Sequence, residues 1–160
     1  MHIATKSSKI DISKEIVTKK VAEQLADVIK KNFTLLFYGN IGVGKTTFIR
    51  HLINYLQTKN GLERTEIPSP TFNIINEYEI NSLIVRHFDL YRIKDKKDLN
   101  NLGINENSED YARLIEWPEI LGQNIESTFT LKFEYDEKLE NRYLILSNNI
   151  DFNFNEFEKI

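Results

Sequence analysis

The stretch LLFYGNIGVGKTTFIR, residues 35–50, contains a complete match to the phosphate-loop pattern G-x-x-x-x-G-K-[ST] at residues 39–46. Glycines let the backbone curl so that successive N–H groups point at phosphate oxygens. In such a loop Lys45 would reach the β- and γ-phosphates and the Thr46 hydroxyl would bind Mg²⁺. The pattern therefore predicts a nucleotide site at Gly39, Asn40, Ile41, Gly42, Val43, Gly44, Lys45, Thr46 and Thr47.

The segments on either side of this loop have the required character. Residues 33–38 (FTLLFY) form a continuous apolar run, which is typical of a strand buried on both faces of a parallel sheet. Residues 45–59 repeat apolar side chains at helical spacing until Asn60 and Gly61 end the pattern. A strand, a phosphate loop and a helix in this order predict an α/β fold of the P-loop NTPase type, with a mixed, mostly parallel sheet flanked by helices.

The remaining pattern completes this prediction. Ser13 is expected to cap a helix that continues to about Lys30. Residues 72–80 and 82–90 predict one antiparallel hairpin, and residues 128–136 and 142–147 predict a second one at an edge of the sheet. Residues 95–104 predict a short helix, and 111–117 a buried strand. We expect one domain over residues 1–160, with a core at about 13–147 and a tail at 148–160 that either docks or frays.

Composition excludes several classes of function. With 21 basic and 24 acidic side chains the net charge is −3, so the concentrated cationic face that holds nucleic acid is not expected. The absence of cysteine excludes disulfides and thiolate-held metals. The apolar runs are far shorter than the ~20 residues that span a bilayer. We therefore expect a cytoplasmic protein with no membrane contact and no strong direct binding of nucleic acid.

Two carboxylates follow predicted strands. Asp89 ends the apolar run LIVRHFD, and Glu116 ends YARLIE. Ligands of open α/β sheets bind at the carboxyl ends of the strands. With Thr46, these acids are the candidate magnesium-site residues, and with Lys45 they are the candidate catalytic residues. The pattern does not decide which acid positions the metal shell and which activates water.

Ser69 and Thr71 lie in a loop that Pro68 and Pro70 exclude from regular hydrogen bonding. A loop at this position can sense a γ-phosphate. From the residues alone, a plain Ser/Thr turn is the favoured interpretation.

A phosphate loop is compatible with several classes of nucleotide-binding protein. A GTP switch would need a guanine-reading N-K-x-D motif, which the chain lacks. A small nucleoside or nucleotide kinase is the alternative to an ATPase, because GNIGVGKTT is similar to the loop of deoxynucleoside kinases. Kinases also need an acceptor pocket and an arginine-rich lid, and no such lid is evident. A non-catalytic binding module is the third possibility.

Four stretches taken together are more specific than the phosphate loop. GNIGVGKTTFIRHL, IPSPTFNIINEY, RHFDLYRI and LIEWPEI, in this order, resemble the TsaE (YjeE) family from about residue 13 to about residue 147. Family members are bacterial ATPases that act with the TsaB and TsaD proteins to make threonylcarbamoyladenosine in tRNA. Asn40 departs from the family, where an acid is common at this position.

The resemblance implies roles for particular residues. ATP and Mg²⁺ would be the cofactors, Asp89 would be the acid of the Walker B type, and Glu116 would serve the metal shell or activate water. Ser69 and Thr71 would belong to a switch-like loop. Three positions are less specific in what they imply: Trp117 would lie near the nucleotide or simply pack, and Glu15 and Arg142 would lie around the base. ATP binding would dock the chain on TsaB and TsaD, and hydrolysis would reset that complex.

Overall fold

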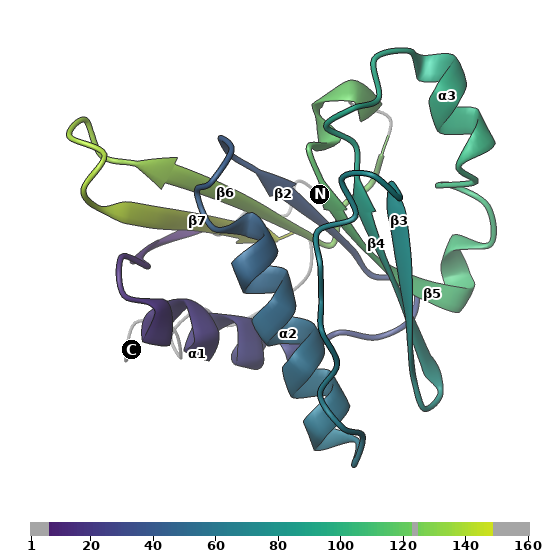
Figure 1. Ribbon diagram of the computed structural model, residues 1–160, viewed down its shortest axis with the longest axis horizontal. Helices are drawn as coiled ribbons and strands as arrows, with labels where there is room; N and C mark the ends of the chain where they lie inside the picture. The colour runs from purple at the N-terminus through teal and green to yellow at the C-terminus, as the bar shows by residue number, and fades with distance from the viewer. Residues whose placement is uncertain (1–6, 123–124, 149–160) are drawn as a thin grey trace, which may run out of the picture.

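The computed structural model describes residues 7–122 and 125–148, so the predicted tail lies almost wholly outside the described residues. Its centre is a seven-stranded sheet in the order β1-β7-β6-β2-β5-β4-β3 (Figure 1). The strands are β1 (Ser7–Asp11), β2 (Thr34–Tyr38), β3 (Ile75–Ile80), β4 (Leu83–Asp89), β5 (Tyr111–Glu116), β6 (Phe129–Tyr135) and β7 (Arg142–Asn148). The helices are α1 (Glu15–Ala26), α2 (Lys45–Lys59) and α3 (Lys96–Asn101), with short 3₁₀ turns at Ser108–Asp110 and Pro118–Leu121.

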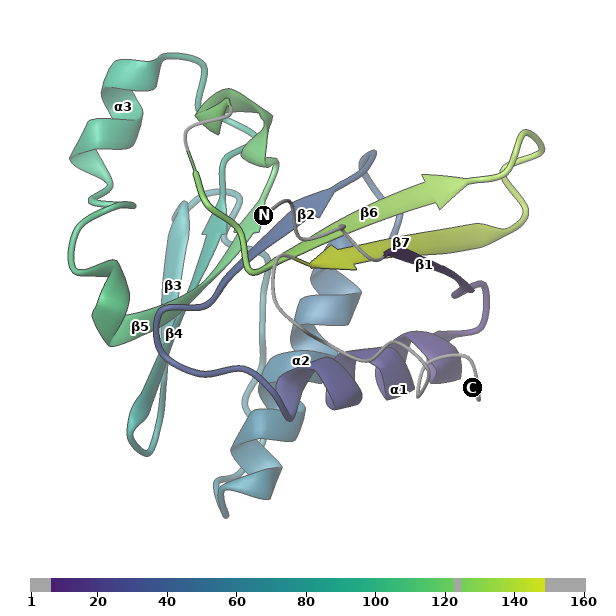
Figure 2. The same cartoon turned by 180° about the vertical axis from the view of Figure 1, so that it is seen from behind.

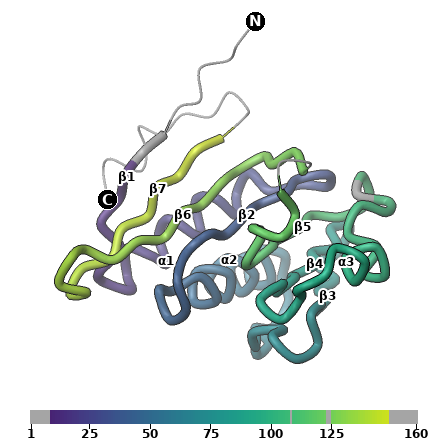
Figure 3. Tube along the Cα trace, turned by 90° about the horizontal axis from the view of Figure 1, so that it is seen from above, coloured from purple at the N-terminus to yellow at the C-terminus, as the bar shows by residue number. Residues whose placement is uncertain are grey.

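The middle of the sheet is parallel. Strand β2 pairs in parallel with β5 and β6, and β4 pairs in parallel with β5. Strand β5 is buried along its whole length, as its apolar sequence predicts. Antiparallel strands complete the sheet on both sides, and Figure 3 follows it from β1 at one end to β3 at the other. The predicted α/β fold with a mixed sheet and antiparallel hairpins is confirmed.

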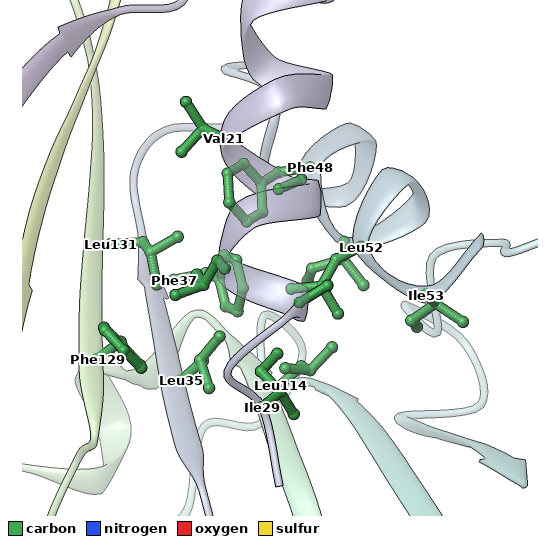
Figure 4. Packing of buried hydrophobic residues seen from close by; sticks show 14 of the residues in the cluster. Val21, Ile29, Leu35, Phe37, Phe48, Leu52, Ile53, Leu114, Phe129 and Leu131 are labelled. Carbon is green, nitrogen blue, oxygen red and sulfur yellow. The ribbon is translucent and has the colours of Figure 1, made fainter. Parts of the chain in front are cut away.

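Helices α1 and α2 pack on one face of the sheet, while α3 lies apart from them beside β3, β4 and β5 (Figures 1 and 2). The apolar stripe of α2 is buried against the strands, and Figure 4 shows Phe48 beside Phe37. The Phe48 ring makes edge contacts with the rings of Phe37 and Phe133. A smaller cluster, which includes Leu36, Phe88 and Ile115, covers the other face under α3 and its loops. This packing fixes the position of the β2–α2 junction, where the phosphate loop lies.

The hairpin of β6 and β7 is not at the sheet edge, and this prediction was wrong. Strand β1 pairs antiparallel with β7, from Ser7 opposite Ser147 to Asp11 opposite Tyr143. The segment SSKID has only one apolar residue, Ile10, so local alternation gives no strand signal. Its strand conformation comes from a partner more than 130 positions away in sequence.

The first helix also differs from the prediction. Helix α1 has Lys14 at its N-cap without a side-chain cap bond, and it ends at Ala26 rather than near Lys30. Ser13 does not cap it: its hydroxyl oxygen accepts the Arg142 N–H at 3.0 Å instead. The apolar pattern continued to Ile29 because a turn beyond the helix buries that side chain as well. Within the described parts of the chain no helix is long and apolar enough to cross a membrane.

Replacing Ser13 with alanine is expected to lower the stability by about 1 kcal/mol, because it leaves the Arg142 N–H without its acceptor. In a domain of this size that corresponds to a fall in Tm of about 2–4 °C. Thermal unfolding followed by circular dichroism measures this fall. The control is Ser82→Ala in the exposed β3–β4 turn, and equal melting of both variants would contradict the role given to Ser13.

Candidate functional site

The phosphate loop lies between β2 and α2, at the edge where the parallel strands end. Only glycine fits at position 39, because its φ is +144° and a Cβ there would lie 2.8 Å from the Phe133 carbonyl oxygen. Gly44 precedes α2 in a left-handed conformation with φ of +113°. From the other side, the Tyr135 hydroxyl donates to the Gly42 carbonyl at 2.9 Å. The β6–β7 hairpin therefore supports the curled loop.

Lys45, the first residue of α2, is buried beneath the phosphate loop. Its Nζ donates to the carbonyls of Gly39 and Asn40 and lies 3.9 Å from the centre of the Trp117 ring. Burial lowers the pKa of Lys45 from its ordinary value, and the nearby carboxylates, Glu116 first among them, oppose that effect. No carboxylate forms an ion pair with this ammonium within 4.0 Å among the described residues. The positive charge is thus available to an anionic ligand of the loop.

Glu116 ends β5 and is buried. The Thr46 hydroxyl donates to this carboxylate, at 3.0 Å from Oε1 and 3.2 Å from Oε2. On the other side, Nε2 of His87 lies 2.8 Å from Oε1. The acid predicted at the end of this strand is therefore in direct contact with the hydroxyl predicted to bind Mg²⁺.

Asp89 ends β4, directly opposite Glu116 in the sheet register. Its Oδ2 accepts hydrogen bonds from the hydroxyls of Ser69 at 3.0 Å and Thr71 at 2.9 Å. Its Oδ1 accepts the backbone N–H of Tyr91 at 3.0 Å. The structure thus gives the two acids different partners: Glu116 contacts Thr46, and Asp89 holds the SPT loop (residues 69–71).

The backbone that follows the SPT loop is strained. Ile74 has a φ of +68°, a conformation that a β-branched residue rarely adopts. Its N–H donates to the Pro70 carbonyl, and its own carbonyl accepts the N–H of Asp89. Strain of this kind persists only where the surrounding contacts enforce it, and it is concentrated at functional sites.

These elements enclose a pocket of about 250 Å³. Most of the predicted site residues line it: Ile41, Gly42, Val43, Gly44, Lys45, Thr46, Thr47, Ser69, Thr71, Asp89, Glu116, Trp117 and Arg142. Gly39 and Asn40 do not line it, because they direct their carbonyls at Lys45 and border a groove beside β6 instead. The carboxyl-end edge of the sheet has therefore gathered residues from five separate stretches of the chain.

Trp117 both lines the pocket and packs against neighbours. It adopts a left-handed conformation with φ of +56°, between β5 and the turn that begins at Pro118. Besides contacting Lys45, its ring centre lies 4.8 Å from that of Tyr91. Trp117 therefore lies beside the candidate nucleotide site and also packs against Tyr91, so both interpretations considered for it describe its position.

Glu15 and Arg142 lie near the phosphate loop, but they are not placed alike. Arg142 lines the main pocket and also a smaller one of about 80 Å³ behind the loop. Glu15 lines only the smaller pocket, and its Oε1 contacts Nε2 of His51 at 2.9 Å. Glu15 therefore lies outside the pocket that contains Lys45 and Thr46.

Three residues of the site were not predicted from the sequence. His87 contacts Glu116, Tyr91 lines the pocket, and Tyr135 holds the phosphate loop. His87 and Tyr91 are part of the stretch RHFDLYRI, so the resemblance marked the segment without giving them roles. Tyr135 had only a strand alternation as its signal, which shows which face a residue occupies and not which loop lies above it.

Comparison with known proteins agrees with this arrangement. Residues 12–144 match the family model described as "Threonylcarbamoyl adenosine biosynthesis protein TsaE". A Rickettsia conorii protein named tRNA threonylcarbamoyladenosine biosynthesis protein TsaE is 39% identical over 110 residues, which are 69% of this chain and 61% of that protein. A Haemophilus influenzae protein of the same name is 32% identical over 139 residues, 84% of each chain.

The fold has a solved counterpart in the crystal structure of YdiB from Bacillus subtilis, with a TM-score of 0.67 over 99% of this chain and 93% of that one. At 24% identity this likeness supports the fold alone. The match to the Rickettsia conorii protein leaves about two fifths of that relative's length uncovered. The family model, in contrast, spans the phosphate loop, the SPT loop and both acids. This chain therefore belongs to the TsaE family of threonylcarbamoyladenosine biosynthesis proteins.

Proposed function

We propose that this chain binds ATP with Mg²⁺, hydrolyses the ATP, and uses the bound nucleotide to dock on TsaB and TsaD during formation of threonylcarbamoyladenosine in tRNA. The observation that carries the proposal is the contact between Thr46 and Glu116 in a pocket that also contains Lys45. A buried ammonium, a hydroxyl and a carboxylate at the mouth of a phosphate loop are the groups that a magnesium–triphosphate requires. The names of the partners come from the family resemblance.

The residues of the pocket fit a magnesium ion that is held mainly by the phosphate oxygens of the nucleotide and by water. Among the described residues there is no cluster of three or more His, Cys, Asp or Glu side chains that could hold a metal alone. Mg²⁺ in phosphoryl-transfer sites keeps several waters and binds one or two protein groups plus phosphate oxygens. Thr46 would supply the direct protein ligand, and Glu116 would bind a water of the shell. When bound, the ion would neutralise charge that develops on the phosphates.

Different contacts assign different tasks to the two acids. Glu116 reaches the Thr46 hydroxyl, so it is the acid that would orient water near the γ-phosphate. Asp89 uses both carboxylate oxygens to hold the SPT loop and the Tyr91 amide. Asp89 would then couple the nucleotide to the SPT loop, because it lines the pocket and also accepts from Ser69 and Thr71, so that a ligand which fixes this carboxylate also fixes the two hydroxyls.

Exposed apolar side chains in and beside the segments that form the pocket support a protein partner: Ile41 and Tyr91 line the pocket, Phe72 follows Thr71, and Leu139 borders the neighbouring groove with Trp117. Ile41 is 74% exposed, Phe72 84%, Tyr91 52% and Leu139 71%, and these residues come from four different segments. Phe72 directly follows the SPT loop, and the Arg92 guanidinium lies over its ring. Large exposed apolar groups near a candidate site are typical of interaction surfaces. The affinity of a partner that binds these side chains would depend on the nucleotide in the adjacent pocket.

The deciding experiment mixes this chain with purified TsaB and TsaD and measures complex formation by size-exclusion chromatography. We expect a complex with ATP and Mg²⁺ that is weakened with ADP or after EDTA removes the metal. Complex formation that is indifferent to nucleotide would contradict the docking proposal. Transfer of phosphate from ATP to an added nucleoside would instead support the kinase alternative.

Replacing Thr71 with valine should weaken the ATP-dependent complex about fivefold. The change keeps the side-chain volume but removes one of the two hydroxyls on Asp89 Oδ2, a loss of about 1 kcal/mol. Surface-immobilised TsaB and TsaD with this chain in solution would give the affinity. The control is Thr58→Val at the far end of α2, where the hydroxyl donates to the carbonyls of Asn54 and Tyr55 in its own helix. Equal affinities of the two variants would exclude a role for the Thr71 hydroxyl.

A further inference from the structure

His87 is a buried polar residue that the proposed function does not yet use. It lies in β4 two positions before Asp89, its side chain is 0% exposed, and it does not line the nucleotide pocket. Among the described residues its one hydrogen-bond partner is Glu116, with Nε2 2.8 Å from Oε1. Nδ1 is buried and has no partner there. Burying an imidazole in a sheet costs free energy, so its contact with Glu116 needs an explanation.

The contacts decide which ring nitrogen carries the proton. A neutral imidazole has one N–H donor and one acceptor nitrogen. With the proton on Nδ1, a donor would be buried without an acceptor and the Nε2 lone pair would face a carboxylate oxygen. With the proton on Nε2, the ring donates to Glu116 and leaves only an acceptor unpaired, which is the less costly defect. His87 therefore donates from Nε2 to Oε1 of Glu116.

This donation occupies a defined part of the Glu116 carboxylate. Oε1 accepts from both His87 and Thr46, whereas Oε2 has only the longer Thr46 contact of 3.2 Å among the described residues. His87 stands on β4, Thr46 on α2 and Glu116 on β5, so three rigid elements set the plane of the carboxyl group. Partners of this kind orient a functional side chain without touching the ligand.

We propose that His87 is a positioning residue: its Nε2–H holds Oε1 of Glu116 and turns Oε2 toward the pocket, where it would receive water. The proposal rests on the proposed function, because it presumes that Glu116 serves ATP hydrolysis. It goes beyond that function because the rate of ATP hydrolysis would then depend on a side chain that contacts neither the nucleotide nor the metal. The required property of His87 is a single donor at the Nε2 position and not a charge.

The test compares His87→Gln with His87→Leu. The glutamine amide nitrogen can occupy the Nε2 position and donate, whereas leucine fills the space without a donor. We expect His87→Leu to lower kcat about 10–100-fold, the usual cost of losing such an orienting partner. His87→Gln should stay within a few-fold of the wild type. Isothermal titration calorimetry should give both variants nearly unchanged ATP affinity, so that the loss falls on kcat and not on binding.

The control is Arg86→Gln, at the neighbouring position of β4, whose side chain pairs with Glu77. A wild-type kcat in His87→Leu, or equal losses in His87→Gln and His87→Leu, would overturn the proposal.

A measurement that needs no substitution is the ¹⁵N chemical shift of His87 in the native protein, for which we expect the Nε2–H tautomer. The Nδ1–H tautomer would overturn the proposal even if His87→Leu failed to fold.

Different results would refute the proposed ATP hydrolysis and the positioning role of His87. A wild-type chain that hydrolyses no ATP, alone or with TsaB and TsaD, refutes the proposed hydrolysis whatever the tautomer of His87 is. A wild-type chain that hydrolyses ATP, together with an unimpaired His87→Leu variant, refutes only the positioning role.

Discussion

Replacing Lys45 with alanine should reduce the affinity for ATP by roughly 100-fold or more. The ammonium lies under the phosphate loop, where it donates to two backbone carbonyls and lies over the Trp117 ring. Hydrogen bonds to charged groups contribute about 1.5–3 kcal/mol each, so losing two phosphate contacts removes about 3 kcal/mol or more. Alanine is compatible with the start of α2, so the loop itself should survive the change.

Isothermal titration calorimetry with ATP and Mg²⁺ measures this loss. Lys20→Ala, which removes an exposed lysine from α1, is the matched control and should bind as the wild type does. A Lys45→Ala variant with unchanged affinity would refute the assignment of the phosphate loop, and with it the proposed function.

Replacing Glu116 with glutamine should lower kcat for ATP hydrolysis by about 10²–10⁴-fold, the usual contribution of a positioned acid–base group. Glutamine keeps the length of the side chain and can still accept from Thr46 and His87, but it cannot take a proton from water. ATP affinity should change far less, because Lys45 and the loop amides remain. The expected signature is therefore a protein that binds ATP and retains it.

Single-turnover hydrolysis of radiolabelled ATP separates this effect from binding. The control is Glu109→Gln. It removes an exposed carboxylate in the turn before β5, away from the pocket, and should leave the rate unaltered. Normal turnover in Glu116→Gln would show that the contact with Thr46 is structural, and Asp89 would then become the acid to replace.

Local sequence patterns were sufficient for the elements around the phosphate loop. An apolar run, a glycine-rich turn and an amphipathic helix predicted β2, the loop and α2, and two strand-end acids were expected at one sheet edge. These features are short-range, and the parallel pairing of β2, β4 and β5 then brings Asp89 and Glu116 together. The sequence therefore predicted most of the residues that the structure brings together around the phosphate loop.

The division of work between the residues could not be predicted, because it depends on contacts between distant segments. Asp89 and Glu116 look alike as strand-end acids, and only the approach of the SPT loop to one and of Thr46 to the other distinguishes them. Strand β1 was missed for the same reason, since its order depends on β7. His87 appeared to be one polar residue in an apolar run, and its meaning came from a neighbour on the adjacent strand.

The position of Trp117 has a practical consequence. It is the single tryptophan of the chain, and its indole lies against the Lys45 ammonium at the floor of the nucleotide pocket. Indole emission responds to a charge that moves near its ring, so selective excitation of this residue observes the pocket and no other part of the protein. The native chain thus carries its own fluorescent probe of pocket occupancy, and stopped-flow kinetics can test the proposed nucleotide binding without a label.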